Sequence, residues 1–329
     1  MIESAGDVDA IHYPFSLSNL AKLHLVAGRL KEAYQLTRQA GEVMERTGRA
    51  GSMGRLILLQ NEAVLLLRLG EIKRAEVALR SAIQREQGDD LSKPAVEPAL
   101  ATHYGEALLI LGRPEEATRW LKYATQKARE SHDTYWETQA KILLTRAQID
   151  LGLLGDAQLN IAEAEAEWPQ DKVANRKILQ DVSRVMAQLQ LALHQPVEAK
   201  QRMNVLLGEL GYPQKTNSPG LIGALPLAAE IDLALNDPAA AETLAAAALA
   251  VAENAARDPG QSADVGKALL ILGQARLSRG NTRGASEALT RAITSLTQGL
   301  GQEHAMTREA RSWLAKADGS PTPMVRAHR

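Results

Sequence analysis

The residues of this chain that could carry out chemistry lie far apart and in no catalytic or metal-binding spacing. The seven histidines include none in an H-E-x-x-H pattern, and His132–Asp133 is a lone pair in a predicted loop. The sequence contains no cysteine, which excludes disulfides, thiolate zinc ligands and a thiol nucleophile. We therefore expect no catalytic residue, no metal site and no cofactor.

Two local stretches resemble functional motifs but favour structural interpretations. The glycine-rich "GRAGSMG" at 48–54 follows a predicted helix and not a strand, so we expect a link between helices and not a phosphate-binding loop. The stretch "EAEAE" at 163–167 alternates carboxylates on a predicted helix, and residues two apart on a helix do not face each other. We expect these carboxylates at a solvated helix end and predict that the chain is not an enzyme.

The charge balance excludes two classes of partner. Lys and Arg number 38 against 39 Asp and Glu, without the basic clusters that nucleic-acid or membrane-surface binding requires. No apolar run reaches the ~18 residues of a membrane span, and the first residues lack the order of a signal peptide. We expect a cytoplasmic chain with neither a nucleic-acid nor a membrane partner, and its Ala- and Leu-rich, Cys-free composition suits a bacterial protein.

A pattern of small residues recurs along the chain and indicates the elements. Gly28 is followed by Ala33 and Ala40, and the same offsets recur in steps of 40 to 44 residues, with turn positions at 28, 70, 112, 152, 194, 236 and 280. Five of these positions hold Gly, the residue that best tolerates the left-handed conformation at a helix end. Each repeat is therefore predicted to be a helix, a turn and a second helix, with small residues where helices pack closely.

The predicted first helices also contain a small residue at a fixed position. The pairs Leu20–Ala21, Tyr104–Gly105 and Leu272–Gly273 each place their small residue seven positions before a turn glycine. With this feature the chain resembles tetratricopeptide repeat (TPR) proteins, whose usual repeat is about 34 residues. The longer period of ~42 resembles the kinesin-light-chain-like subclass, as do the stretches at 16–33 and 299–317.

The resemblance implies an all-α fold, an α-solenoid wound as a right-handed superhelix of about seven TPR-like helix–turn–helix units with a C-terminal capping helix. We expect a lead-in over 1–13, the repeat array over 14–301, the capping helix over 302–317 with Trp313 facing inward, and a flexible tail over 318–329. On the second repeat, Glu71, Glu76 and Arg80 are expected to be exposed.

The resemblance also implies that first helices line a concave groove that binds a protein or peptide. The candidate groove residues are Asn19, Lys22, Gln60, Asn61, His103, Glu106, Arg146, Arg184, Gln188, Lys267 and Gln274. Asn19 and Asn61 occupy equivalent positions, where the subclass also carries Asn, and paired amides can hold a peptide backbone.

Two functions remain open from the sequence. The first is a non-enzymatic protein-interaction scaffold that binds a peptide or a helix in the groove. The second is a regulatory or sensor region of a larger bacterial signalling protein, such as a kinase or a transcriptional regulator. A homo-oligomer is compatible with either.

Overall fold

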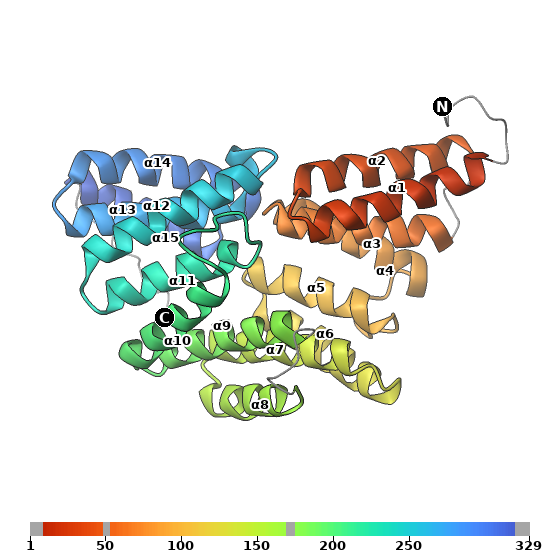
Figure 1. Ribbon diagram of the computed structural model, residues 1–329, viewed down its shortest axis with the longest axis horizontal. Coiled ribbons are helices and arrows are strands. Elements are labelled where there is room, and N and C mark those ends of the chain that lie inside the picture. Colours follow the sequence, from red (N-terminus) through yellow and green to blue (C-terminus); the bar gives the residue numbers. More distant parts are fainter. Residues whose placement is uncertain (1–8, 49–52, 169–174, 320–329) are drawn as a thin grey trace, which may run out of the picture. The chain divides into compact units, whose positions relative to one another are not determined.

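The computed structural model describes residues 9–48, 53–168 and 175–319, and the regular structure in these ranges is helical (Figure 1). The chain divides into two compact units, Met1–Ala192 and Leu193–Arg329, here called the N-terminal and C-terminal units. Within the described part of the chain, no helix combines the length and the apolarity needed to cross a membrane.

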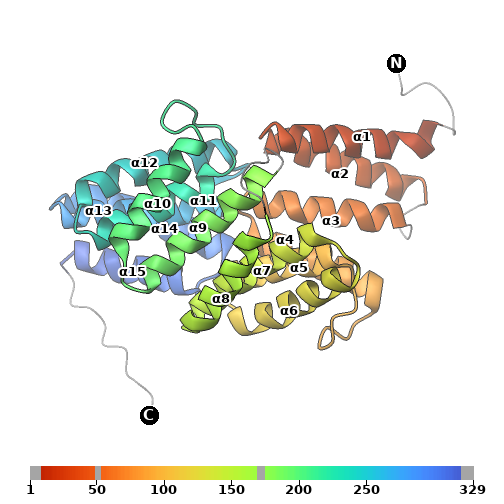
Figure 2. The ribbon, with the colours of Figure 1, turned by 60° about the horizontal axis from the view of Figure 1, so that its bottom comes forward.

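The N-terminal unit consists of helical hairpins (Figures 1 and 2). Its helices are α1 (Asp9–Val26), α2 (Leu30–Arg46), α3 (Met53–Arg68), α4 (Ile72–Gln87), α5 (Pro98–Ile110), α6 (Pro114–Glu130), α7 (Thr134–Asp150), α8 (Leu154–Ala166) and α9 (Arg176–Ala192). The pairs α1–α2, α3–α4, α5–α6 and α7–α8 each pack together, and the first helices α3, α5, α7 and α9 also contact one another in this order. This second set of contacts creates a shared first-helix surface.

The C-terminal unit continues the same pattern. Its helices are α10 (Pro196–Glu209), α11 (Leu221–Ala234), α12 (Pro238–Ala255), the short η2 (Pro259–Gln261), α13 (Ala263–Ser278), α14 (Thr282–Gly299) and α15 (Ala305–Ala317). The hairpins α11–α12 and α13–α14 pack internally, and α15 packs on α14 and α13. The last helix therefore covers the end of the α13–α14 hairpin.

The turn of each hairpin has a left-handed residue at the position that the repeat predicts. Residues 28, 70, 112, 152, 194, 236 and 280 all have φ between 58° and 80°. The following N–H then reaches a carbonyl five residues back, as from Glu71 N to Leu66 O (2.9 Å) and from Asp237 N to Asp232 O (2.9 Å). These bonds satisfy carbonyls that the end of a helix would otherwise leave without partners.

The small residues hold the two helices of each hairpin close together. Ala33, Ala40, Ala75 and Ala82, five and twelve positions after their turns, are fully buried. Seven positions before the third turn, a Cβ added to Gly105 would lie 2.6 Å from Leu121 Cδ2 and Cγ of the facing helix. The first and second helices therefore meet at a distance that only a small side chain permits.

Several expected features differ in the structure. Helix α1 begins at Asp9, ahead of the expected start at 14, and Pro14 lies inside it, where proline removes a single backbone hydrogen bond. The expected link at 48–54 and the expected tail lie partly outside the described residues, because 49–52 and 320–329 are not described.

The C-terminal helix α15 packs through residues other than the one expected. Thr307 and Ala310 are its buried side chains, whereas Trp313 is half-buried, with the Lys316 ammonium 4.1 Å from its ring centroid. The structure thus covers Trp313 only in part, whereas Thr307 and Ala310 are the fully covered side chains of this helix.

Two acidic residues that the sequence placed on the exposed surface are buried. Glu71 is 2% exposed and pairs with Arg74, and Glu76 is 5% exposed and pairs with Arg80. Tyr104 also donates a hydrogen bond to Glu76 Oε1 (3.4 Å) from the next hairpin. Arg74 and Arg80 lie within about one turn of their acidic partners, and Tyr104 comes from the next hairpin. The spacing of small residues that placed the repeats gives no indication of this burial.

The close approach of the helices predicts that two Gly→Ala substitutions in the N-terminal unit change the free energy of unfolding in different ways. Gly105→Ala should lower the free energy of unfolding by roughly 1–3 kcal/mol, because the added methyl overlaps Leu121. This loss should exceed the gain of about 0.5–1 kcal/mol that Ala brings to a helix.

The matched control is Gly155→Ala on α8, where an added Cβ meets nothing within 4 Å. This variant should be neutral or slightly more stable than the wild type in urea unfolding. Equal effects of the two substitutions would contradict the close contact at Gly105.

Candidate functional site

The first-helix face of the N-terminal unit includes four of the predicted groove residues, His103, Glu106, Arg146 and Arg184. We define this face by six residues on α3, α5, α7 and α9: Arg68, His103, Glu106, Gln139, Arg146 and Arg184. Their helices contact one another in sequence order, so the six side chains come from neighbouring elements.

A small hollow lies between α1 and α3, beside the same face. Ser18 and Lys22 of α1 and Asn61 and Val64 of α3 are among the residues that line it. Asn61 Nδ2 donates a long hydrogen bond to Ser18 Oγ (3.4 Å), while Asn19 is exposed. The structure thus gives Asn61 a partner within the protein, and Gln60, its neighbour on α3, is half-buried.

Glu106 lies at the centre of the face and is surrounded by cations. Its carboxylate is 3.3 Å from Arg68 Nη1 of α3 and 3.7 Å from His103 Nδ1, one turn earlier on α5. Burial raises the pKa of Glu106, but attraction to Arg68, His103 and Arg146 outweighs burial and holds the pKa well below its usual range. Glu106 is therefore an ionised carboxylate shared among several basic groups.

Arg146 of α7 has a less favourable environment than Arg68. Burial lowers its pKa, repulsion from Arg184 lowers it further, and attraction to Glu106, Asp150 and Asp181 only partly compensates. On α9, Arg184 Nη2 lies 3.3 Å from Asp181 Oδ1, and Gln188 is half-buried one turn further on. The charge of Arg184 on α9 therefore acts on Arg146 from a neighbouring helix.

Aromatic side chains border the face at the beginning of α7. The rings of His103 and Trp136 meet edge-on with centroids 5.2 Å apart, and Trp136 meets Tyr135 at 5.1 Å. Tyr135 remains 38% exposed. Burial raises the pKa of Tyr135 and the charge of Asp181 raises it further, which places this ring beside the charged residues of the face.

Two buried nitrogens of the face have no hydrogen-bond partner among the described residues: Gln139 Nε2 and Arg146 Nε. Gln139 and Arg146 lie seven residues apart, so both project from the same side of α7. Buried polar groups are nearly always hydrogen-bonded, so this concentration of free nitrogens is unusual.

The sequence did not indicate Tyr135, Trp136 or Gln139 as site residues. Gln139 occupies the α7 position that corresponds to Ala99 on α5, and an Ala there gives no sign of a polar position. The seven-residue spacing between Gln139 and Arg146 is the feature of the sequence that could have indicated Gln139 as a site residue.

The two predicted groove residues of the C-terminal unit are engaged within that unit. Lys267 Nζ lies 3.0 Å from Glu230 Oε1, and Gln274 Nε2 donates to Glu309 Oε1 (2.8 Å). Their polar groups are already paired, unlike Gln139 Nε2 and Arg146 Nε of the first-helix face.

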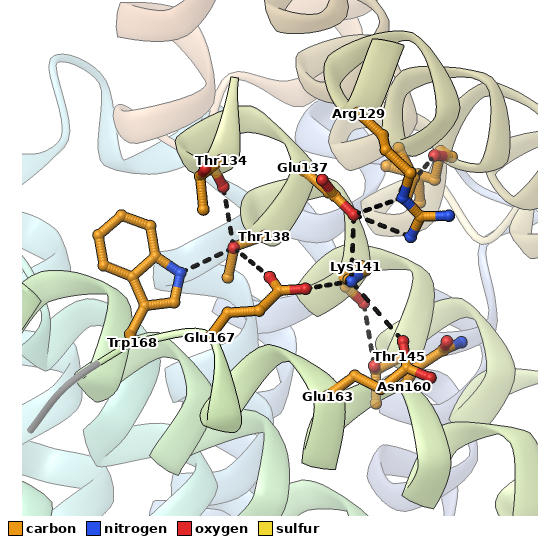
Figure 3. A network of polar contacts seen from close by, with 12 residues as sticks. Arg129, Thr134, Glu137, Thr138, Lys141, Thr145, Asn160, Glu163, Glu167 and Trp168 are labelled. Atoms are coloured by element: carbon orange, nitrogen blue, oxygen red, sulfur yellow. Dashed lines mark hydrogen bonds and ion pairs between the residues drawn. The ribbon is translucent and has the colours of Figure 1, made fainter. Parts of the chain in front are cut away.

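A second polar cluster lies on another side of α7, toward α8 (Figure 3). Lys141 is buried, and its Nζ contacts Glu137 (3.2 Å), Glu163 (3.6 Å) and Glu167. Burial lowers the pKa of Lys141, but Glu167 and Glu137 outweigh burial and raise the pKa above its ordinary value. The cluster is an ion-paired lock between the two helices of one hairpin.

The lock corrects the interpretation of "EAEAE". Glu163 and Glu167 stand four residues apart, so both face α7 and converge on Lys141, which the i, i+2 comparison overlooked. Trp168 Nε1 also donates to Thr138 Oγ1 (2.7 Å) at the end of this cluster. Within the described ranges, no group of three histidine or carboxylate side chains is arranged to hold a metal ion.

Comparisons with known proteins address the fold. No protein-family model matches the sequence, and no curated protein matches it. A Rap protein in complex with competence and sporulation factor aligns with a TM-score of 0.61 at 14% identity, over 93% of this chain and 89% of that chain.

Two further solved structures align over similar lengths. A tetratricopeptide repeat protein from Parabacteroides merdae has a TM-score of 0.49 at 13% identity, over 93% of this chain and 99% of that chain. The TPR2AB domain of yeast Sti1, in a pHSP90 complex, has a TM-score of 0.34 at 17% identity, over 93% of this chain and 98% of that chain. The similarity to the Rap protein, together with the stacked hairpins, confirms an all-α solenoid with a TPR-like fold.

The lock on α7 predicts a large effect of removing its cation. Lys141→Met should lower the free energy of unfolding by up to about 3 kcal/mol, because Glu137, Glu163 and Glu167 then repel one another without a counter-charge. As a control, Arg129→Ala removes a cation that is 63% exposed beside Glu137, and should cost less than ~1 kcal/mol. Urea unfolding compares the two, and equal losses would show that the lock is not buried.

The depressed pKa of Glu106 predicts a pH-dependent contribution to stability. The stabilisation of wild type over Glu106→Gln should be complete above the unfolded pKa of about 4.3 and should fall by about 1.4 kcal/mol per pH unit below it, as protons bind the unfolded chain first. Urea unfolding between pH 3 and 7 can be followed by tryptophan fluorescence, since Trp120, Trp136 and Trp168 lie in the N-terminal unit. A stability difference between wild type and Glu106→Gln that does not change with pH would contradict the ionised, paired state of Glu106.

Proposed function

We propose that the chain is a non-enzymatic scaffold that binds an extended peptide or a helix of a partner protein along the first-helix face. The observation that carries this proposal is the pair of buried nitrogens on α7, Gln139 Nε2 and Arg146 Nε, that have no hydrogen-bond partner among the described residues. A buried polar group without a partner costs roughly 1–3 kcal/mol. A ligand that supplies acceptors to these groups recovers that energy on binding.

A peptide offers the acceptors that this face needs. Its backbone carbonyls can accept hydrogen bonds from Gln139 and Arg146, which project from one side of α7. The exposed ring of Tyr135 adds an apolar contact surface beside them. The face thus combines hydrogen-bond donors with an aromatic border, as peptide-binding surfaces do.

The remaining predicted residues extend the proposed site unequally. Asn19, Lys22, Gln60 and Asn61 lie on α1 and α3, and Gln188 lies on α9, so all belong to the N-terminal unit. Lys267 and Gln274 would first have to leave Glu230 and Glu309, so we propose that they contribute less to binding.

We further propose that the repeats belong to the kinesin-light-chain-like subclass, on the basis of their ~42-residue period, and that the chain acts in the cytoplasm of a bacterium. The second candidate function, a regulatory region of a larger bacterial signalling protein, is favoured by one observation. The Rap protein of similar fold was solved with competence and sporulation factor bound, so this fold can hold such a signal in that protein.

A selection for peptide ligands tests the scaffold proposal. Random peptides displayed on phage are selected on the wild-type protein, and the selected peptides are then measured against the double variant Asn61→Ala, Arg146→Ala. We expect at least about a tenfold loss of affinity, because the hydrogen bond lost at the charged Arg146 contributes about 1.5–3 kcal/mol. Circular dichroism should show an unchanged helical signal.

The control also removes one arginine and one side-chain amide, from the second helix α6. Arg119 and Gln126 are exposed there, and Arg119→Ala, Gln126→Ala should leave the affinity within about twofold. If this control abolished binding while the first variant bound normally, the ligand would use another surface and the proposal would fail.

A further inference from the structure

One side of helix α1 presents apolar side chains to solvent. Phe15, Leu20, Leu23 and Val26 are between 43% and 84% exposed, and no other helix of the described ranges carries more than two exposed large apolar residues. A patch of this kind marks a surface that contacts another molecule.

Four exposed residues on this side form a continuous row, here called the α1 seam. Ser16, Leu20, Leu23 and Ala27 follow one another at intervals of four, three and four residues, and all four are exposed. Ala27 N donates to Leu23 O (3.0 Å), so the helical path continues to the last of them. An average interval of about 3.5 residues is the one at which two helices keep one side in contact along their length.

The same positions in the next hairpin are buried against the helix before it. Forty-two residues after the α1 seam, α3 and the residue that follows it hold Leu58, Glu62, Leu65 and Leu69, all of which are buried. Glu62 accepts a hydrogen bond from Tyr34 of α2 (3.5 Å). The seam positions thus contact the second helix of the preceding hairpin, and among the described residues no second helix precedes α1.

Within the stack this contact includes polar pairs, which the α1 seam lacks. Leu20 occupies the position of Glu62 on α3 and of Tyr104 on α5. Glu62 lies 3.5 Å from Arg38 of α2, and Tyr104 donates to Glu76 of α4 (3.4 Å). The α1 seam contains no charged side chain, so its chemistry matches another uncharged, apolar helix surface and not the polar second helices of this stack.

Helix α15, which covers the α13–α14 hairpin, does not provide such a surface. It exposes Arg308, Glu309, Arg311 and Lys316. Burying these charges against leucines would remove them from water without partners, which disfavours a head-to-tail contact between copies. An identical seam on a second copy brings no charge into the contact.

We propose that two copies of this chain associate through their α1 seams, with the two helices antiparallel about a two-fold axis. Leu20 of each copy then lies opposite Leu23 of the other, and Ser16 lies opposite Ala27. Large side chains meet at the centre of the contact and small ones at its ends, and the symmetry closes the assembly at two copies. The interface goes beyond the proposed peptide-binding function and uses none of the residues that define the first-helix face.

Sedimentation velocity of the full chain, at concentrations from about 1 to about 100 μM, measures this association. We expect the wild type to shift from monomer to dimer and to form no larger species. Leu20→Glu, Leu23→Glu should weaken the association at least about a hundredfold, because the introduced carboxylates face one another in the contact. Circular dichroism should show an unchanged helical signal, since both leucines are exposed.

Two further variants separate the seam from a general effect of charge. Val77→Glu, Leu159→Glu makes the same change at exposed residues of α4 and α8 and should leave the association within about twofold of wild type. Leu20→Glu, Leu23→Lys places opposite charges face to face only if the helices are antiparallel. We expect it to associate at least about tenfold more tightly than Leu20→Glu, Leu23→Glu.

Three outcomes would overturn the inference. A wild type that is monomeric at the highest concentration assigns the α1 seam to a different occupant, such as residues 1–8 or a helix of another protein. Association that survives Leu20→Glu, Leu23→Glu, or that is lost equally in the α4 and α8 control, uses another surface. If Leu20→Glu, Leu23→Lys associates as weakly as Leu20→Glu, Leu23→Glu, the antiparallel arrangement is wrong.

Discussion

The hairpins of this protein depend on the close approach of their two helices, which only small side chains permit. Gly105 and Gly273 each stand seven residues before a turn glycine, and Cβ atoms added there would lie 2.6 and 2.5 Å from Leu121 and Leu289. The left-handed residue at the turn and the hydrogen bond behind it then fix where the second helix begins. Because close packing uses one side of each first helix, another side is left for contacts with the neighbouring first helices and for polar residues.

Helix α7 carries two basic residues, Lys141 and Arg146, whose charges are compensated to different degrees. Lys141 faces α8 and is matched by three carboxylates, so its burial is fully compensated. Arg146 lies on the first-helix face, where the charge of Arg184 acts on it and its Nε has no hydrogen-bond partner among the described residues. A compensated buried cation stabilises the fold, whereas an undercompensated one stores energy that a ligand can release.

The sequence predicted the features that follow from backbone geometry. Gly, Asn and Ala at fixed offsets indicated the turns and the close contacts, since few residues satisfy either requirement. The sequence missed features that depend on a partner from a distant part of the chain. Glu76 is buried beside Tyr104 and Arg113 of the next hairpin, and Glu163 joins Glu167 only because Lys141 lies opposite. For the same reason the list of groove residues included Lys267, which pairs with Glu230, and omitted Gln139.

The most direct test of this account observes the Nε–H group of Arg146. The side chains can be labelled with ¹⁵N-arginine, the signal assigned with Arg146→Lys, and a peptide selected by phage display added to saturation. The account predicts that the Arg146 Nε–H proton resonance moves downfield and becomes protected from exchange with solvent, as a hydrogen bond to the ligand forms. An unchanged Arg146 resonance in the saturated complex would contradict it.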